Sequence, residues 1–212
     1  MKFRLALAAL ALSAMSHATL INASFETPAQ PQGNYTQSGI DGWTTDGSSA
    51  GVWHLPANSF FEANAPDGLQ IGYSNGNFVA QQASDELEVG TTTLSVMGGR
   101  RTDSFAGSFF LRLWAGGTVA SGDIIGGTLL GESYYGYTAY NPSTFSLITV
   151  EYTAAANDPL LGQLLTVQFA KAVGSQMNWD DVRLVTPNPV PEPISIFVLG
   201  AGAVALSRKR KV

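Results

Sequence analysis

Side chains alternate in part along Ser108-Phe109-Phe110-Leu111-Arg112-Leu113-Trp114. A second segment, from Thr144 to Tyr152, shows the same tendency, because Ile148, Val150 and Tyr152 would share one face of an extended chain. Such a period of two is typical of a β-strand with one buried face. No stretch of helical length shows a clear apolar stripe of period 3.6. The two segments therefore predict an all-β domain.

Short β-branched and aromatic runs recur on both sides of these segments, bounded by Gly, Asn, Pro, Ser and Asp. The strands predicted from them are Leu20–Phe25, Val52–Leu55, Leu69–Tyr73, Phe78–Gln82, Glu88–Met97, Ser108–Trp114, Gly127–Tyr134, Thr144–Thr153, Leu164–Ala170 and Met177–Val185. Turn signals such as Asp67-Gly68 and Asn75-Gly76 separate several of them. About ten short strands over residues 19–185 predict a two-sheet antiparallel jelly-roll sandwich.

The composition excludes several classes of function. The chain has 212 residues, of which 45% are apolar and 13% charged, and its net charge is −5. This acidic balance argues against a nucleic-acid partner, because phosphates are neutralised by clustered Lys and Arg. The chain has no cysteine, which removes disulfides, thiolate metal sites and thiol catalysis together.

The N-terminus has the three parts of a secretory signal peptide. Lys2 and Arg4 form a basic start, an apolar run follows from Leu5 to Met15, and Ser16-His17-Ala18 is a small-x-small cleavage site. We predict that residues 1–18 are the signal peptide and that signal peptidase cleaves between Ala18 and Thr19. The protein is therefore expected to be exported.

The C-terminus also has three parts in a fixed order. A Pro-rich linker at residues 186–190 leads to Pro191-Glu192-Pro193, an apolar run follows at 194–206, and the chain closes with Arg208, Lys209, Arg210 and Lys211. As a helix the run would be about 20 Å long, against a hydrocarbon core of about 30 Å, so it fits either a short span or a buried segment. The basic cluster favours a membrane helix whose C-terminus stays cytoplasmic.

This order resembles a PEP-CTERM sorting signal at residues 191–212. The resemblance implies transient anchoring in the inner membrane of a Gram-negative bacterium. An exosortase-type membrane protease would then recognise Pro191-Glu192-Pro193 and remove the tail, which leaves the protein extracellular or on the outer surface. An ordinary single-span tail anchor would satisfy the same residues.

The two ends of the domain sequence carry a further resemblance. The mature chain opens with Leu20-Ile21-Asn22-Ala23-Ser24-Phe25-Glu26 and the domain closes with Gln176-Met177-Asn178-Trp179-Asp180-Asp181-Val182-Arg183-Leu184. Together with Gly42-Trp43, this set resembles galactose-binding-domain-like jelly rolls, the architecture of many carbohydrate-binding modules. The resemblance implies that the first and last strands run side by side.

Carboxylates at these two ends predict a structural Ca²⁺. If the terminal strands are adjacent, Glu26, Asp180 and Asp181 could supply part of the oxygen shell that Ca²⁺ takes. The charge supports this, because six of the 11 basic residues but only one of the 16 acids lie in the two removable ends, which leaves the domain at −10. The alternative is that Glu26 is solvated and one Asp makes turn hydrogen bonds.

Aromatic residues predict a weak glycan-binding face. Tyr134, Tyr135, Tyr137 and Tyr140 form the most loop-like aromatic cluster, and flat rings can cover the C–H face of a sugar. The alternative for each ring is packing in the sandwich. Gly98-Gly99-Arg100-Arg101 lacks the signature of a phosphate loop and is interpreted as a solvated hairpin.

Candidate catalytic groups are few. His54 lacks a nucleophile elbow or an organised triad, and nothing distinguishes a carboxylate pair among Glu62, Glu132 and Glu151. We therefore predict a non-enzymatic protein of the extracellular polysaccharide matrix or cell surface. Two alternatives stay open: a small extracellular hydrolase acting on polysaccharide, and a structural surface protein without a ligand.

Overall fold

A computed structural model describes residues 20–187, apart from residues 58–59, 62–63 and 104. The described residues form antiparallel strands and one 3-10 turn, η1 (Tyr137–Ala139), and contain no α-helix. None of them belongs to a helix long and apolar enough to span a membrane. The predicted signal peptide (1–18), its cleavage site, the sorting motif and the membrane helix (194–206) lie outside the described residues.

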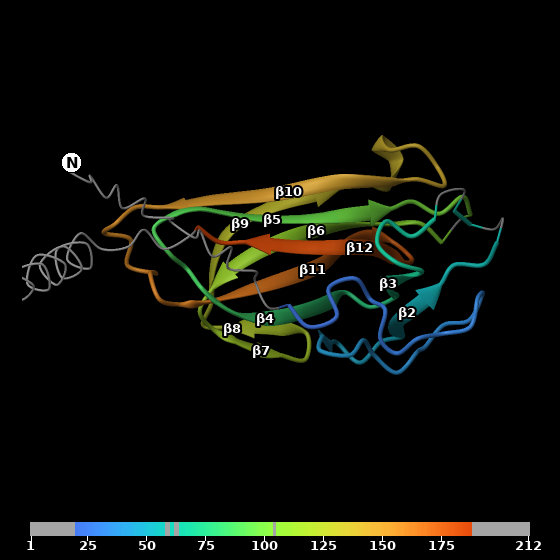
Figure 1. Ribbon diagram of the computed structural model, residues 1–212, viewed down its shortest axis with the longest axis horizontal. Helices are drawn as coiled ribbons and strands as arrows, with labels where there is room; N and C mark the ends of the chain where they lie inside the picture. The colour runs from blue at the N-terminus through green and yellow to red at the C-terminus, as the bar shows by residue number, and fades with distance from the viewer. Residues whose placement is uncertain (1–19, 58–59, 62–63, 104, 188–212) are drawn as a thin grey trace, which may run out of the picture. The chain divides into compact units, whose positions relative to one another are not determined.

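Two five-stranded sheets make up the domain (Figure 1). The first sheet has, in spatial order, β1 (Thr44–Thr45), β4 (Phe78–Glu86), β11 (Leu164–Gly174), β6 (Gly107–Ala115) and β9 (Thr128–Tyr135). The second sheet has β10 (Phe145–Ala154), β5 (Gly90–Gly99), β12 (Met177–Val185), β3 (Gln70–Ser74) and β2 (Ala50–His54). A separate hairpin consists of β7 (Thr118–Ala120) and β8 (Asp123–Ile125). The predicted two-sheet antiparallel sandwich is confirmed.

Alternation in β6 separates a core face from a solvent face. Phe109, Leu111 and Leu113 have no exposed surface and lie in the main core. Arg112 points the other way, and its Nε donates to Glu132 Oε2 on the neighbouring strand β9 at 2.8 Å. Burial of the three apolar side chains, at about 1.5–3 kcal/mol each, fixes which face of the strand turns inward.

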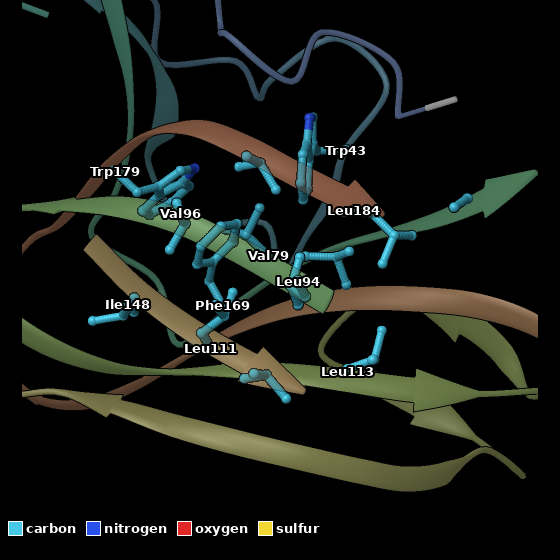
Figure 2. Close-up of a cluster of buried hydrophobic side chains, with 14 of the residues drawn as sticks. Trp43, Val79, Leu94, Val96, Leu111, Leu113, Ile148, Phe169, Trp179 and Leu184 are labelled. Atoms are coloured by element: carbon cyan, nitrogen blue, oxygen red, sulfur yellow. The ribbon is translucent and has the colours of Figure 1, made fainter. Parts of the chain in front are cut away.

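The main core lies between the two sheets and has an aromatic centre (Figure 2). Trp179 on β12 stacks on Phe169 of β11, with the ring centroids 4.4 Å apart. The indole also requires a glycine opposite, because a Cβ on Gly72 would lie 2.7 Å from Trp179 Nε1. Packing around Trp179, both across the sheets and within its own sheet, is therefore close enough to select residue size at single positions.

The strand predicted at Leu20–Phe25 is wrong. Asn22 and Phe25 have φ angles of 52° and 57°, which an extended strand cannot accommodate, and the segment forms turns. The segment nevertheless lies beside the last strand, because the Val182 N–H donates to the Ala23 carbonyl at 3.1 Å. The sequence analysis also missed the short strands β1, β7 and β8.

Candidate functional site

A cavity of about 600 Å³ lies on the face of β2 and β3 that turns away from the main core. Its volume is within the range typical of sites for small organic ligands. Aromatic side chains dominate its walls, and the residues that line it are Gly33, Tyr35, Gln37, Ser49, Trp53, Pro56, Phe60, Tyr73, Asn75, Arg101, Phe105, Ser175 and Gln176.

Strand alternation places two of these aromatic side chains. On β2, Val52 belongs to the main core, so its neighbour Trp53 turns to the opposite face. On β3, Gly72 faces the core, so Tyr73 turns outward beside Trp53. The second sheet therefore buries apolar surface on both faces at this end.

Hydrogen bonding and ring contacts hold Tyr73 in place. Its hydroxyl donates to the Thr36 carbonyl at 2.5 Å, and burial raises the pKa of the phenol. The ring of Tyr35 meets it edge to face, with the centroids 6.1 Å apart. Tyr35 is itself about half exposed, so it forms part of the rim of the cavity.

Arg101 is a buried cation in the wall of the cavity, with 9% of its surface exposed. Its guanidinium carbon lies 4.3 Å from the ring centroid of Phe60, 5.1 Å from that of Trp53 and 5.5 Å from that of Phe105. Asp103 receives a two-pronged ion pair, from Nε at 3.0 Å and from Nη2 at 2.6 Å. The interpretation of this segment as a solvated hairpin is therefore wrong for Arg101.

A chain of hydrogen bonds continues from Arg101 along the wall. Its Nη1 donates to Gln176 Oε1 at 2.5 Å, and Gln176 Nε2 donates to Asn75 Oδ1 at 3.1 Å. Asn75 lies in the turn between β3 and β4, which Asp46 fixes by accepting from the Asn77 N–H at 2.6 Å. Residues distant in sequence are thus fixed around one guanidinium.

The acids predicted to bind Ca²⁺ are only partly brought together. Glu26 Oε1 accepts from the N–H groups of Leu69 and Gln70, both at 2.8 Å, and Asp180 Oδ2 accepts from the Asp67 N–H at 2.8 Å. Glu26 and Asp180 therefore hold the same loop. Asp181 instead accepts from Arg183 Nε at 2.7 Å. The described part of the chain contains no group of three or more His, Cys, Asp or Glu side chains placed to hold a metal.

Asp180 is fully buried, and no cation pairs with it among the described residues. Burial raises the pKa of its carboxyl to about 8, although the N–H groups of Asp67 and Asp181 oppose this rise by donating to it. The buried carboxyl therefore keeps its proton to a higher pH than a solvated carboxyl does.

The four tyrosines predicted to bind glycan do not form one platform. Tyr135 is fully buried and stacks on both Phe109 and Tyr140. Tyr134, its neighbour on β9, points to the other face of the sheet, is half exposed and lies against Phe110. Tyr137 lies in η1 and, like Tyr140, packs against the main core. Strand alternation and packing thus separate residues that are adjacent in sequence.

His54 lies on β2 beside Trp53, at a second cavity of about 340 Å³. Its Nδ1 is 2.7 Å from the Gln30 carbonyl, which only accepts, so Nδ1 carries the proton. Glu132 is paired with Arg112, Glu151 is an exposed residue of β10, and Glu62 lies outside the described residues. These contacts assemble neither a triad nor a carboxylate pair.

Residues 16–185 match the family model described as HpiC1-like, HpiC1 cyclase. The chain belongs to the HpiC1-like cyclase family. Crystal structures of cyclases from Fischerella sp. TAU share its fold. The Stig cyclase Fisc, in complex with (3Z)-3-(1-methyl-2-pyrrolidinylidene)-3H-indole, is 23% identical with a TM-score of 0.67, and the alignment covers 82% of this chain and 99% of that one.

A second cyclase structure from the same organism is in complex with 4-(1H-indol-3-yl)butan-2-one. It is 23% identical with a TM-score of 0.66, and the alignment again covers 82% of this chain and 99% of the other. A search of curated proteins gave no match.

Membership in this cyclase family corrects the functional predictions. The assignment to PEP-CTERM proteins with a carbohydrate-binding-module-like domain is wrong, because the family found is the HpiC1-like cyclases. The prediction of a non-enzymatic matrix protein is also wrong, because the family and its neighbours in structure are cyclases. The same finding overturns the two alternatives, a polysaccharide hydrolase and a surface protein without a ligand.

The sequence analysis did not bring together the aromatic and polar residues that line the 600 Å³ cavity. One signal for them existed. Arg101 is one of five basic residues in a domain of net charge −10. Phe105 lies close to it in the sequence, and Phe60 lies farther away. A scarce cation near aromatic residues is a candidate for cation–π packing, and we interpreted it only as a surface charge.

Proposed function

We propose that the protein is a cyclase that binds a flat, indole-like aromatic substrate in the 600 Å³ cavity. Membership in the HpiC1-like family carries the proposal, because a cyclase closes a ring within its substrate. The cavity supports it: Trp53, Phe60, Tyr73 and Phe105 offer apolar ring faces and edges to an aromatic guest. Two cyclases of similar structure have been crystallised in complex with indole compounds, which guide the choice of ligand.

The walls of the cavity suit ring closure, in which two ends of one flexible molecule must meet. A pocket that holds the substrate folded supplies orientation before the reaction, and orientation alone can lower a barrier by several kcal/mol. The side chains of this wall are constrained, because Tyr73 is hydrogen-bonded and Arg101 is held on several sides. Ser49, Ser175 and Gln37 add polar groups to a mostly apolar surface.

Titration calorimetry of the purified full chain with 4-(1H-indol-3-yl)butan-2-one tests the binding site. We expect saturable binding at one site. Phe105→Ala removes an exposed ring from the cavity and should weaken binding about tenfold, since an aromatic contact contributes of order 1 kcal/mol and excludes water.

The matched control is Tyr134→Ala, which removes a similarly exposed ring from the outer face of the other sheet. It should leave the affinity unchanged. Equal weakening by both variants, or no saturable binding by the parent protein, would contradict the proposed site.

A structural Ca²⁺ held by Glu26 and Asp180 is a separate proposal. The supporting observation is the fully buried Asp180 carboxyl, which has no cation partner among the described residues and whose pKa is raised by burial. The ion would hold the Asp67–Gln70 loop between the N-terminal segment and β12, and so stabilise the fold. Thermal melting of the full chain with and without a chelator tests it, because a lost ion should lower the melting temperature.

A further inference from the structure

We propose that Arg101 is the specificity-determining residue of the large cavity, and that it selects an uncharged aromatic ligand carrying a carbonyl-type hydrogen-bond acceptor. The inference rests on the proposed function, because it assumes that the cavity is the ligand site. It adds to that function the chemical class of the substituent and the residue that recognises it.

A count of donors is the first support. A guanidinium has five N–H bonds. Three of those on Arg101 are used, by Nε and Nη2 toward Asp103 and by Nη1 toward Gln176. The other two, one on Nη1 and one on Nη2, have no acceptor within the part of the chain that the structure describes. Arg101 lines the cavity, so a ligand oxygen can supply the missing acceptor.

Rigidity is the second support. The two-pronged pair with Asp103 fixes the plane of the guanidinium, and Gln176 fixes its rotation from another side. The rings of Trp53 and Phe60 confine it further. A donor that is already immobile loses little entropy when a ligand binds, so its hydrogen bond contributes more fully to affinity.

Charge decides between ligand classes. Arg101 is the one charged side chain among the described residues that line the cavity, so an ammonium group on the ligand would face a cation in a largely apolar space. Asp103 already balances the guanidinium charge, so an anionic group on the ligand is not needed to neutralise Arg101. The strongly acidic domain would also repel such a group. A neutral acceptor such as a ketone satisfies both conditions.

Three probes on one skeleton test this class. They are 4-(1H-indol-3-yl)butan-2-one, 3-butylindole and 4-(1H-indol-3-yl)butan-2-amine. Their four-carbon side chains carry a ketone, no polar group and an ammonium group, respectively. We expect the full chain to bind the ketone about tenfold tighter than 3-butylindole, because a hydrogen bond to a charged donor is among the stronger ones. The amine should bind most weakly.

Two variants assign the preference to Arg101. Arg101→Met with Asp103→Asn removes the donors without leaving a partly exposed carboxylate unpaired beside the cavity, and should make the ketone and 3-butylindole bind equally. Arg101→Lys keeps the charge but loses the planar fork, and should lose most of the preference for the ketone. Thermal melting shows whether each variant is folded.

An infrared measurement on the parent protein needs no variant. The carbonyl stretch of the ¹³C-labelled ketone should fall on binding, relative to the same ketone in an aprotic solvent, because a hydrogen bond weakens the C=O bond. An unshifted stretch would overturn the inference even if the variants fail to fold.

The outcomes separate the two proposals. If none of the three probes binds, the proposed function fails. If all three bind with equal affinity, the proposed site stands and the role of Arg101 is overturned. A preference for the ketone that survives in the folded Arg101→Met/Asp103→Asn protein assigns the recognition to another donor and likewise overturns it.

Discussion

The two faces of the second sheet both carry tryptophan, yet they use it differently. On the inner face Trp179 is fully buried and stacks on Phe169 at 4.4 Å, inside a core that spans both sheets. On the outer face Trp53 packs in a smaller apolar cluster with Phe60 and Phe61, but it also borders a cavity of about 600 Å³ and a guanidinium. Close packing on one face stabilises the sandwich, and incomplete packing on the other leaves room for a ligand.

Replacing each tryptophan by alanine should give the largest difference in stability between the two faces. Trp179→Ala should lower the free energy of unfolding by about 3–5 kcal/mol, because it leaves a large void between the sheets. Trp53→Ala should cost about 1–3 kcal/mol, since part of its ring already faces open space.

Urea denaturation of both variants against the parent protein measures the difference. Equal losses would show that the outer face is packed as tightly as the inner face. Trp53→Ala should in addition weaken the binding of 4-(1H-indol-3-yl)butan-2-one by more than the Phe105→Ala variant does.

A second comparison concerns two buried ionisable side chains. Arg101 on the cavity side has a carboxylate partner, whereas Asp180 has only backbone N–H donors. If Ca²⁺ compensates Asp180, its addition at about 100 times its dissociation constant should raise the stability by about 2.7 kcal/mol. EDTA should lower the melting temperature of the full chain, and Asp180→Asn should abolish both effects. A melting temperature that neither Ca²⁺ nor EDTA moves would rule out the ion.

The smallest predicted effect concerns the turn that positions Asn75. Burial alone would raise the pKa of Asp46, but the hydrogen bonds from the Asn77 and Ser48 N–H groups outweigh it and lower the pKa. A carboxyl with a lowered folded pKa stabilises the protein above its unfolded pKa of about 3.9, and this contribution is lost as the pH falls through the folded value.

Asp46→Asn should therefore cost up to about 1 kcal/mol at neutral pH and less at pH 2. Urea denaturation at both values measures this. The same loss at both pH values would show that the carboxylate charge is irrelevant to the turn.

How far the sequence predicts the molecule depends on the range of the interactions. Alternation in β6 and β10 is local, so the sequence predicts which side chains of these strands turn inward. The segment Leu20–Phe25 has strand-like composition, yet it turns at Asn22 and Phe25, and its hydrogen bonds to Gln81 and Val182 join it to residues far away in the sequence.

The cavity depends on still longer-range contacts. Arg101 and Gln176 are 75 residues apart in sequence, and only the pairing of the strands brings them together. The Tyr-rich run was predicted to bind glycan because it is the most loop-like aromatic cluster, yet strand alternation sends Tyr134 and Tyr135 to opposite faces. Adjacency in sequence is thus a poor guide to a site that four or more segments build.

A crystal structure of the protein in complex with 4-(1H-indol-3-yl)butan-2-one tests the central claim most directly. We predict that the indole lies among Trp53, Phe60, Tyr73 and Phe105, with the ketone oxygen within hydrogen-bond distance of the Arg101 guanidinium. A ligand bound elsewhere on the domain, or one whose ketone points away from Arg101, would contradict it.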